Sequence, residues 1–144
     1  MILENQVCSL SLAKKLKALG VKKESLFLHV TFKNKSSTIP ETELNEIIWY
    51  SDLEEEVEKN YLEDMNFYSA FTVAELIDML PNLPQPFRLS FGIENPDIDL
   101  GGKYYCTTNR ISYPDDHDFY SDNLANCLAE MIILLIKNGI IKNE

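Results

Sequence analysis

Three cysteines and two histidines are the residues of this chain that could support nucleophilic chemistry. A thiol nucleophile needs a nearby base and a lowered pKa, and the pairings that would supply them are Cys106 with His117 or with His29. Cys8 precedes a predicted helix and Cys127 falls on an apolar helix face, where a free cysteine is usually buried and inert. A metal- or thiol-dependent enzyme using Cys106 and His117 is therefore one alternative, and not the favoured one.

The run Asp115-Asp116-His117-Asp118 is the second place where chemistry could occur. Carboxylates and imidazole are ligands for Mn²⁺ or Zn²⁺. Adjacent residues seldom converge on one ion, so we interpret the run as a turn with helix-capping carboxylates. Gly101-Gly102 lacks the framework of a phosphate-binding loop and is interpreted as a turn. We predict no catalytic residue, no metal and no cofactor.

Charge is segregated along the chain. Residues 1–35 carry seven lysines against two glutamates, a net charge of +5, whereas residues 36–144 carry a net charge of −15. An acidic surface repels nucleic acid and anionic membranes and attracts basic proteins. We therefore expect a protein partner, one with a basic surface, and do not expect direct binding to nucleic acid.

The acidic groups are concentrated after Trp49 and Tyr50. We predict that the binding face contains Glu54, Glu55, Glu56 and Glu58. Surface charge runs usually serve solubility, so a solvated helix face is the simplest interpretation. A second alternative is an acidic nucleic-acid mimic that occupies the DNA groove of a host DNA-handling or defence protein.

Helix boundaries are the clearest local signals. Ser9 can cap a first helix that Gly20 ends. Thr72 and Glu75 form a capping box, which is worth on the order of 1 kcal/mol. Ser121 or Asp122 is expected to open a final helix that residue 139, a glycine, closes. The apolar arc of that helix is so wide that it must be covered on more than one side. We expect either a central position in the fold or a homodimer that buries its apolar side chains, such as Ile133 and Leu134.

Alternating or β-branched runs predict strands at residues 26–32, 47–50, 87–93 and 103–113, the last two as antiparallel neighbours. The fold class is therefore α+β, with an antiparallel sheet of about four strands and helices packed mainly on one face. Residues 1–144 are expected to form one domain. The odd number of cysteines and the lack of a signal-peptide pattern at residues 1–5 favour a reduced, cytoplasmic protein. The apolar run 131–136 is far shorter than the roughly 20 residues that span a bilayer.

Three segments carry a resemblance through their helix boundaries and core residues: 8–21 with 24–27, then 68–81, then 129–135 with Asn138-Gly139. In these segments the chain resembles a group of small uncharacterised proteins of phages, prophages and mobile elements from gut anaerobic bacteria. The resemblance implies an accessory viral or mobile-element protein. It implies no activity and no site residue, because the shared residues determine folding and not chemistry.

The favoured prediction is a non-enzymatic protein that acts by protein–protein interaction. Each alternative should leave its own structural trace. A nucleic-acid mimic should present acidic groups along one ridge, and an enzyme should bring His117 and Cys106 or His29 together in a cleft. A protein-binding domain should present a contiguous apolar patch.

Overall fold

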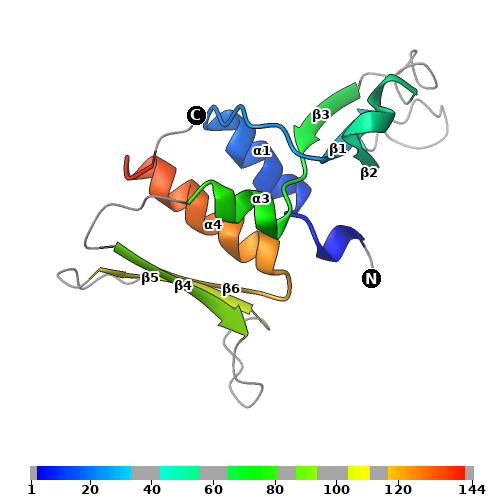
Figure 1. Cartoon of the computed structure of the whole chain (residues 1–144). Coiled ribbons are helices and arrows are strands. Elements are labelled where there is room, and N and C mark those ends of the chain that lie inside the picture. Colours follow the sequence, from blue (N-terminus) through cyan, green and yellow to red (C-terminus); the bar gives the residue numbers. More distant parts are fainter. Residues whose placement is uncertain are drawn as a thin grey trace.

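The computed structural model describes residues 3–33, 43–55, 65–80, 87–93, 104–110 and 117–141. Their helices are α1 (Leu10–Ala18), α3 (Val73–Asp78) and α4 (Leu124–Lys137), with short 3-10 turns η1 (Leu3–Asn5) and η2 (Tyr50–Asp52). Their strands are β1 (Phe27–Lys33), β2 (Glu43–Trp49), β3 (Met65–Ser69), β4 (Phe87–Ile93), β5 (Tyr104–Arg110) and β6 (His117–Ser121). The predicted α+β class is confirmed (Figure 1).

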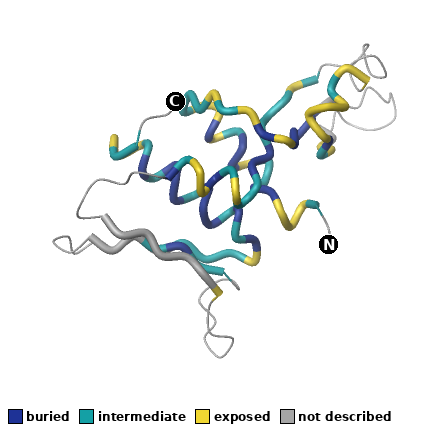
Figure 2. Tube along the Cα trace, in the orientation of Figure 1, coloured by how far each residue is buried: buried dark blue, intermediate teal, exposed yellow. Residues whose placement is uncertain are grey.

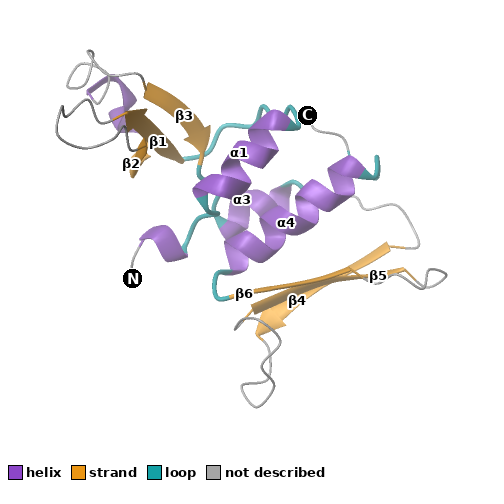
Figure 3. Ribbon diagram, turned by 180° about the vertical axis from the view of Figure 1, so that it is seen from behind, coloured by secondary structure: helices purple, strands orange, loops and turns teal. Residues whose placement is uncertain are grey.

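The strands form two antiparallel sheets, where the sequence predicts a single sheet of about four strands. The first sheet has the order β2-β1-β3 and the second has the order β4-β5-β6. The expected pairing of β4 with β5 is present and matches Phe91 with Cys106. The two sheets lie on different sides of the helices (Figures 1 and 3). Strand patterns identify strands but not their neighbours, which explains the difference.

The start of the last helix is displaced from its predicted position. Ser121 ends β6, a strand whose first two residues, His117 and Asp118, belong to the run that the sequence predicts as a turn, and the N-cap of α4 is Asn123. The Asn123 side chain accepts from Ala125 N at 2.8 Å and donates to Val7 O at 2.8 Å. Ser121 lies before this cap, and its hydroxyl accepts from Asn123 N at 3.1 Å and not from an N–H of the helix.

The other helix boundaries follow the sequence signals. Ser9 caps α1 by accepting from Leu12 N, and Gly20 follows in the left-handed conformation with φ 88°. Thr72 and Glu75 form both bonds of the capping box at the start of α3. Gly139, with φ 69°, ends α4. These boundaries are confirmed because each depends on residues within one or two turns.

Helix α4 occupies the centre of the main core. It packs against α1 and α3 on one side and against β5 and β6 on another. Most of its side chains are buried, as the dark segment in Figure 2 shows, and they include Leu128, Met131, Ile132 and Ile133. The predicted cover on more than one side is therefore supplied within the chain. A homodimer through this helix is no longer needed to explain its apolar arc.

The first sheet contributes two smaller apolar clusters. Leu28, Val30 and Ile48 are buried together on one face, while Phe27 packs with Val7 and Ala70 on the other. In the described part of the chain, no helix is both long and apolar enough to cross a membrane; α4, with 14 residues, is the longest.

Candidate functional site

Glu75 ties helix α3 to the start of strand β1. Its carboxylate accepts from Thr72 N at 2.8 Å, as the capping box requires, and also from Leu26 N at 2.9 Å. The Ser25 hydroxyl donates to the same carboxylate at 2.8 Å. Glu75 therefore fixes the point at which the chain enters the first sheet, a role that its local sequence does not indicate.

The hydrogen bonds also determine the charge state of Glu75. Burial alone would raise the pKa of this carboxyl, but the donors at Thr72, Leu26 and Ser25 together hold its pKa below the usual value of 4.5. A carboxylate that receives several N–H and O–H bonds is stabilised in its charged form. Glu75 is therefore ionised at neutral pH and holds Leu26 in place.

Leu26, placed in this way, forms one side of an exposed apolar group at the end of the first sheet. Leu26 is 62% exposed, Trp49 is 54% exposed and Tyr50 is 41% exposed. Tyr50 N donates to Leu26 O at 2.8 Å, so the two lie side by side. The centres of the Trp49 and Phe27 rings are 4.4 Å apart, so the Trp49 ring packs against the Phe27 ring on one face of the sheet. Large apolar side chains that are exposed at one end of a sheet are candidates for an interaction site.

Acidic residues follow this group directly along the chain. Asp52, Glu54 and Glu55 are all exposed on the 3-10 turn and the short helical stretch after Tyr50. We call the combined surface the aromatic–acidic patch, and it consists of Leu26, Trp49, Tyr50, Asp52, Glu54 and Glu55. Of the predicted acidic face, Glu54 and Glu55 thus lie on this patch, while Glu56 and Glu58 lie outside the described residues.

The sequence predicts only part of this patch. Trp49 and Tyr50 are predicted there as strand residues, and their exposure depends on their place at the end of an edge strand. A run of aromatic residues directly before a run of acids was the signal available in the sequence. The contribution of Leu26 had no such signal, because Glu75 holds it from a distant helix.

The three thiols are buried and reduced. Cys8, Cys106 and Cys127 have no exposed surface. Burial raises the pKa of Cys106 to about 12, with a further rise from the neighbouring Cys127. Burial likewise raises the pKa of Cys8 to about 11 and that of Cys127 to about 11. A thiol must ionise to act as a nucleophile, and these pKa values keep all three protonated at neutral pH.

We expect none of the three thiols to react with a disulfide reagent such as DTNB in the native protein, and all three to react once the protein is unfolded in guanidinium chloride. The thiols should become reactive only when the whole protein unfolds, because their side chains are inaccessible in the folded state. The measurement is the labelling rate with and without denaturant. One thiol that reacts rapidly in the native protein would contradict the pKa values and reopen thiol catalysis.

The candidate catalytic residues lie on different elements. Cys106 is on β5 of the second sheet, and His29 is on β1 of the first sheet. His117 is on β6, where its backbone pairs with Thr108, two residues from Cys106. Its side chain lies outside the described part of the structure, as do Asp115 and Asp116. Among the described residues, no three His, Cys, Asp or Glu side chains gather as a metal site would require.

His29 is a buried imidazole with a structural partner. Its Nε2 lies 2.7 Å from Cys8 O, and because a carbonyl only accepts, Nε2 carries the proton. Burial lowers the pKa of His29, and the hydrogen bond to Cys8 O opposes this effect only in part. Nδ1 is buried without a hydrogen-bond partner in the described ranges. His29 therefore joins the first sheet to the segment before α1 as a neutral group.

We expect the stability of the protein to fall as the pH drops below 6.5, the pKa of an unperturbed histidine. Because the folded state holds the pKa of His29 lower, the unfolded chain binds the proton first, so its contribution is complete above pH 6.5 and is lost below it. The slope stays below about 1.4 kcal/mol per pH unit, which is the limit for one titrating proton. Urea unfolding at several pH values measures it.

His29→Gln provides the comparison for this prediction. The glutamine amide can still donate to Cys8 O but does not titrate, so the pH dependence assigned to His29 should disappear from the variant. An unchanged slope in His29→Gln would show that other groups cause it.

The chain was compared with protein-family models, with curated proteins and with solved structures, and none of the three comparisons gave a match. The resemblance to phage and mobile-element proteins therefore stays a prediction from the sequence. The function must be argued from the site itself.

Proposed function

We propose that this chain is a non-enzymatic binding protein that acts by protein–protein interaction through the aromatic–acidic patch. The observation that supports the proposal is that Leu26, Trp49 and Tyr50 are all exposed at the same end of the first sheet. Tryptophan and tyrosine are enriched among the residues that dominate binding energies at interfaces. The supporting Phe27 ring holds Trp49 in place before any partner arrives, which lowers the entropic cost of binding.

The acidic part of the patch defines the partner. Asp52, Glu54 and Glu55 would meet lysine or arginine side chains around an apolar depression that receives Trp49. Charges at an interface rim steer association and select partners more than they add affinity. The partner is therefore a protein with a basic surface surrounding an apolar pocket.

The resemblance in the sequence suggests the biological context in which this partner would be found. We place the protein in the cytoplasm as an accessory protein of a phage or mobile element, and its three buried, reduced thiols agree with a reducing compartment. The basic partner would then be a host protein. The acidic nucleic-acid mimic stays a second prediction, since a ridge of acids would also require Glu56 and Glu58.

Site-specific photo-crosslinking tests the proposal. A benzoylphenylalanine residue placed at Trp49 should crosslink a basic protein in the native host. The matched control is the same residue at Ile93, which is 67% exposed at the end of β4 in the second sheet. Both sites are exposed apolar positions at strand ends. A difference in crosslinking between them therefore shows binding at one specific surface and not non-specific hydrophobic association.

The crosslinking results at positions 49 and 93 either support or overturn the proposal. A basic protein captured at position 49 and not at position 93 supports the proposal. Equal capture at both positions, or capture of nothing but a second copy of the chain, would overturn it. The second result would instead indicate a homodimer.

A further inference from the structure

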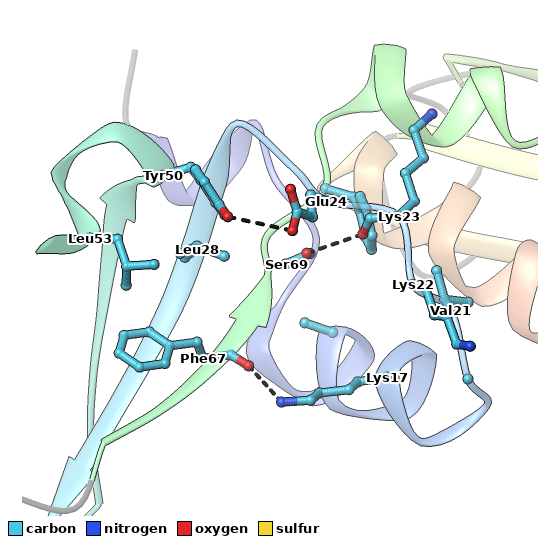
Figure 4. A pocket seen from close by; sticks show the side chains of 13 residues that line it. Lys17, Val21, Lys22, Lys23, Glu24, Leu28, Tyr50, Leu53, Phe67 and Ser69 are labelled. Carbon is cyan, nitrogen blue, oxygen red and sulfur yellow. Dashed lines mark hydrogen bonds between the residues drawn. The ribbon is translucent and has the colours of Figure 1, made fainter. Parts of the chain in front are cut away.

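A cavity of about 500 Å³ lies between helix α1, the segment after it and the first sheet. Its walls are mainly apolar and include Leu28, Leu53 and Phe67 from the sheet side and Val21 from the segment after α1. Figure 4 shows these side chains around a common opening. Small-molecule sites commonly have volumes of about 300–1,000 Å³ and apolar walls with few polar groups. The cavity has the size and composition of such a site.

Lys17 is the amine that reaches this opening. Its Nζ donates to Phe67 O at 2.9 Å and lies 4.8 Å from the centre of the Tyr68 ring. These contacts hold the ammonium beside the apolar wall, as Figure 4 shows. An ammonium has three N–H donors, and Phe67 O is its one oxygen acceptor in the described part of the chain. Lys17 can therefore donate to a ligand without leaving its position.

The other charged groups of the lining are already engaged or point elsewhere. Glu24 accepts from the Tyr50 hydroxyl at 3.4 Å, on the far side of the opening from Lys17. Lys22 and Lys23 extend away from the opening in Figure 4, and Lys23 Nζ lies 3.4 Å from Glu75 O. Lys17 is therefore the lysine of the lining whose ammonium faces the opening, with Glu24 opposite it. A held ammonium beside apolar walls favours a ligand with an anionic head group and a hydrocarbon tail.

We propose that this cavity binds a small amphipathic anion, with its hydrocarbon part on Leu28, Leu53 and Phe67 and its carboxylate or phosphate on Lys17. Charge complementarity determines the head group, and the apolar walls determine the tail. The inference does not rest on the proposed protein interaction, although Tyr50 belongs to both the cavity lining and the aromatic–acidic patch.

Titration of the full chain with decanoate and with decyl phosphate, each below its critical micelle concentration, tests the inference. Calorimetry should give saturable binding of one equivalent. Backbone NMR shifts should concentrate at Leu28, Leu53 and Phe67. Decyltrimethylammonium, which has the same chain with a cationic head, should not saturate the site. The tighter of the two anions identifies the head group as carboxylate or phosphate.

Two lysines of α1 provide a matched pair of variants. Lys14 and Lys17 both lie over the Tyr68 ring, but Lys17 alone of the two lines the cavity. Lys17→Met keeps the aliphatic stem and removes the charge, so it should weaken binding about tenfold or more. Lys14→Met should change affinity less than about twofold. Lys17→Arg keeps the charge and should retain binding, which provides a second test if Lys17→Met folds poorly.

Three results would overturn the inference. They are the absence of saturable binding by either anion, equal binding of the cation, and equal losses in Lys17→Met and Lys14→Met. The last would show a general attraction of anions to the lysines of α1. None of these results would bear on crosslinking at Trp49.

Discussion

Replacing Glu75 with alanine is expected to lower the free energy of unfolding by about 2–3 kcal/mol. The change removes one bond of the capping box and the acceptor of both Leu26 N and the Ser25 hydroxyl. Ser25 can still donate to Ala70 O at 3.0 Å, which limits the loss. Urea or thermal unfolding measures it.

Two further variants separate the roles of Glu75. Thr72→Ala should cost about 0.5–2 kcal/mol, and the double variant should lose less than the two single losses together, because both residues form one box. Asp78→Ala, an exposed carboxylate on the same helix, is the control and should change stability by less than about 0.5 kcal/mol. Equal small effects of Glu75→Ala and Asp78→Ala would contradict the role assigned to Glu75.

The lowered pKa of Glu75 adds an acid dependence. Because the folded state holds this pKa below 4.5, the contribution of the carboxylate is complete above pH 4.5 and is lost as the pH falls through the folded value. The loss assigned to Glu75 begins near pH 4.5, whereas that assigned to His29 begins near pH 6.5. Glu75→Gln should lack the loss at acid pH.

Replacing Trp49 with alanine is expected to weaken binding of the crosslinked partner by at least about 30-fold, or about 2 kcal/mol. The Trp49 ring is half exposed, so the loss arises from removal of its contact with the partner more than from unfolding. Titration of purified partner with each variant measures the affinity.

Matched variants distinguish this role from a structural one. Trp49→Phe should recover part of the affinity, since a smaller ring can enter the same pocket and stack on Phe27. Ile93→Ala, in the second sheet, should leave the affinity unchanged within about twofold. If Trp49→Ala also stays within about twofold while remaining folded, the patch is not the contact surface.

Local signals account for the parts of the fold that the sequence predicts. Ser9, Gly20, Thr72 and Gly139 determine helix ends through bonds to residues a few positions away. Such bonds can be recognised in the chain, because their geometry depends on the backbone of a single turn. The alternation in β1 and β4 identifies these strands in the same way.

The pairings that decide the architecture are not local. Strand β6 begins with His117-Asp118, polar residues after a Pro-Asp-Asp turn signal, and it is a strand because β5 pairs with it. The division into two sheets depends on packing around α4, which separates β1 from β5. No periodicity within one strand contains that information.

The candidate site likewise has features that the local sequence predicts and features that depend on distant contacts. The acids that follow Trp49 are visible in the sequence, and so is the box that contains Glu75. The position of Leu26 beside Tyr50, in contrast, depends on the hydrogen bond from Leu26 N to the Glu75 carboxylate, which is 49 residues away in the sequence. Lys17 at the cavity depends likewise on its bond to Phe67 O, 50 residues away.

Association kinetics of the crosslinked partner at low and high salt test the central claim most directly. The comparison uses wild type and a variant with Glu54, Glu55, Glu56 and Glu58 all changed to lysine. The account predicts that the wild-type association rate falls steeply as ionic strength rises past about 0.1 M, where the Debye length is about 10 Å. It predicts a slower association for the variant at low salt, with an unchanged fold. Identical rates for both proteins at every salt concentration would contradict the claim that the aromatic–acidic patch recognises a basic partner.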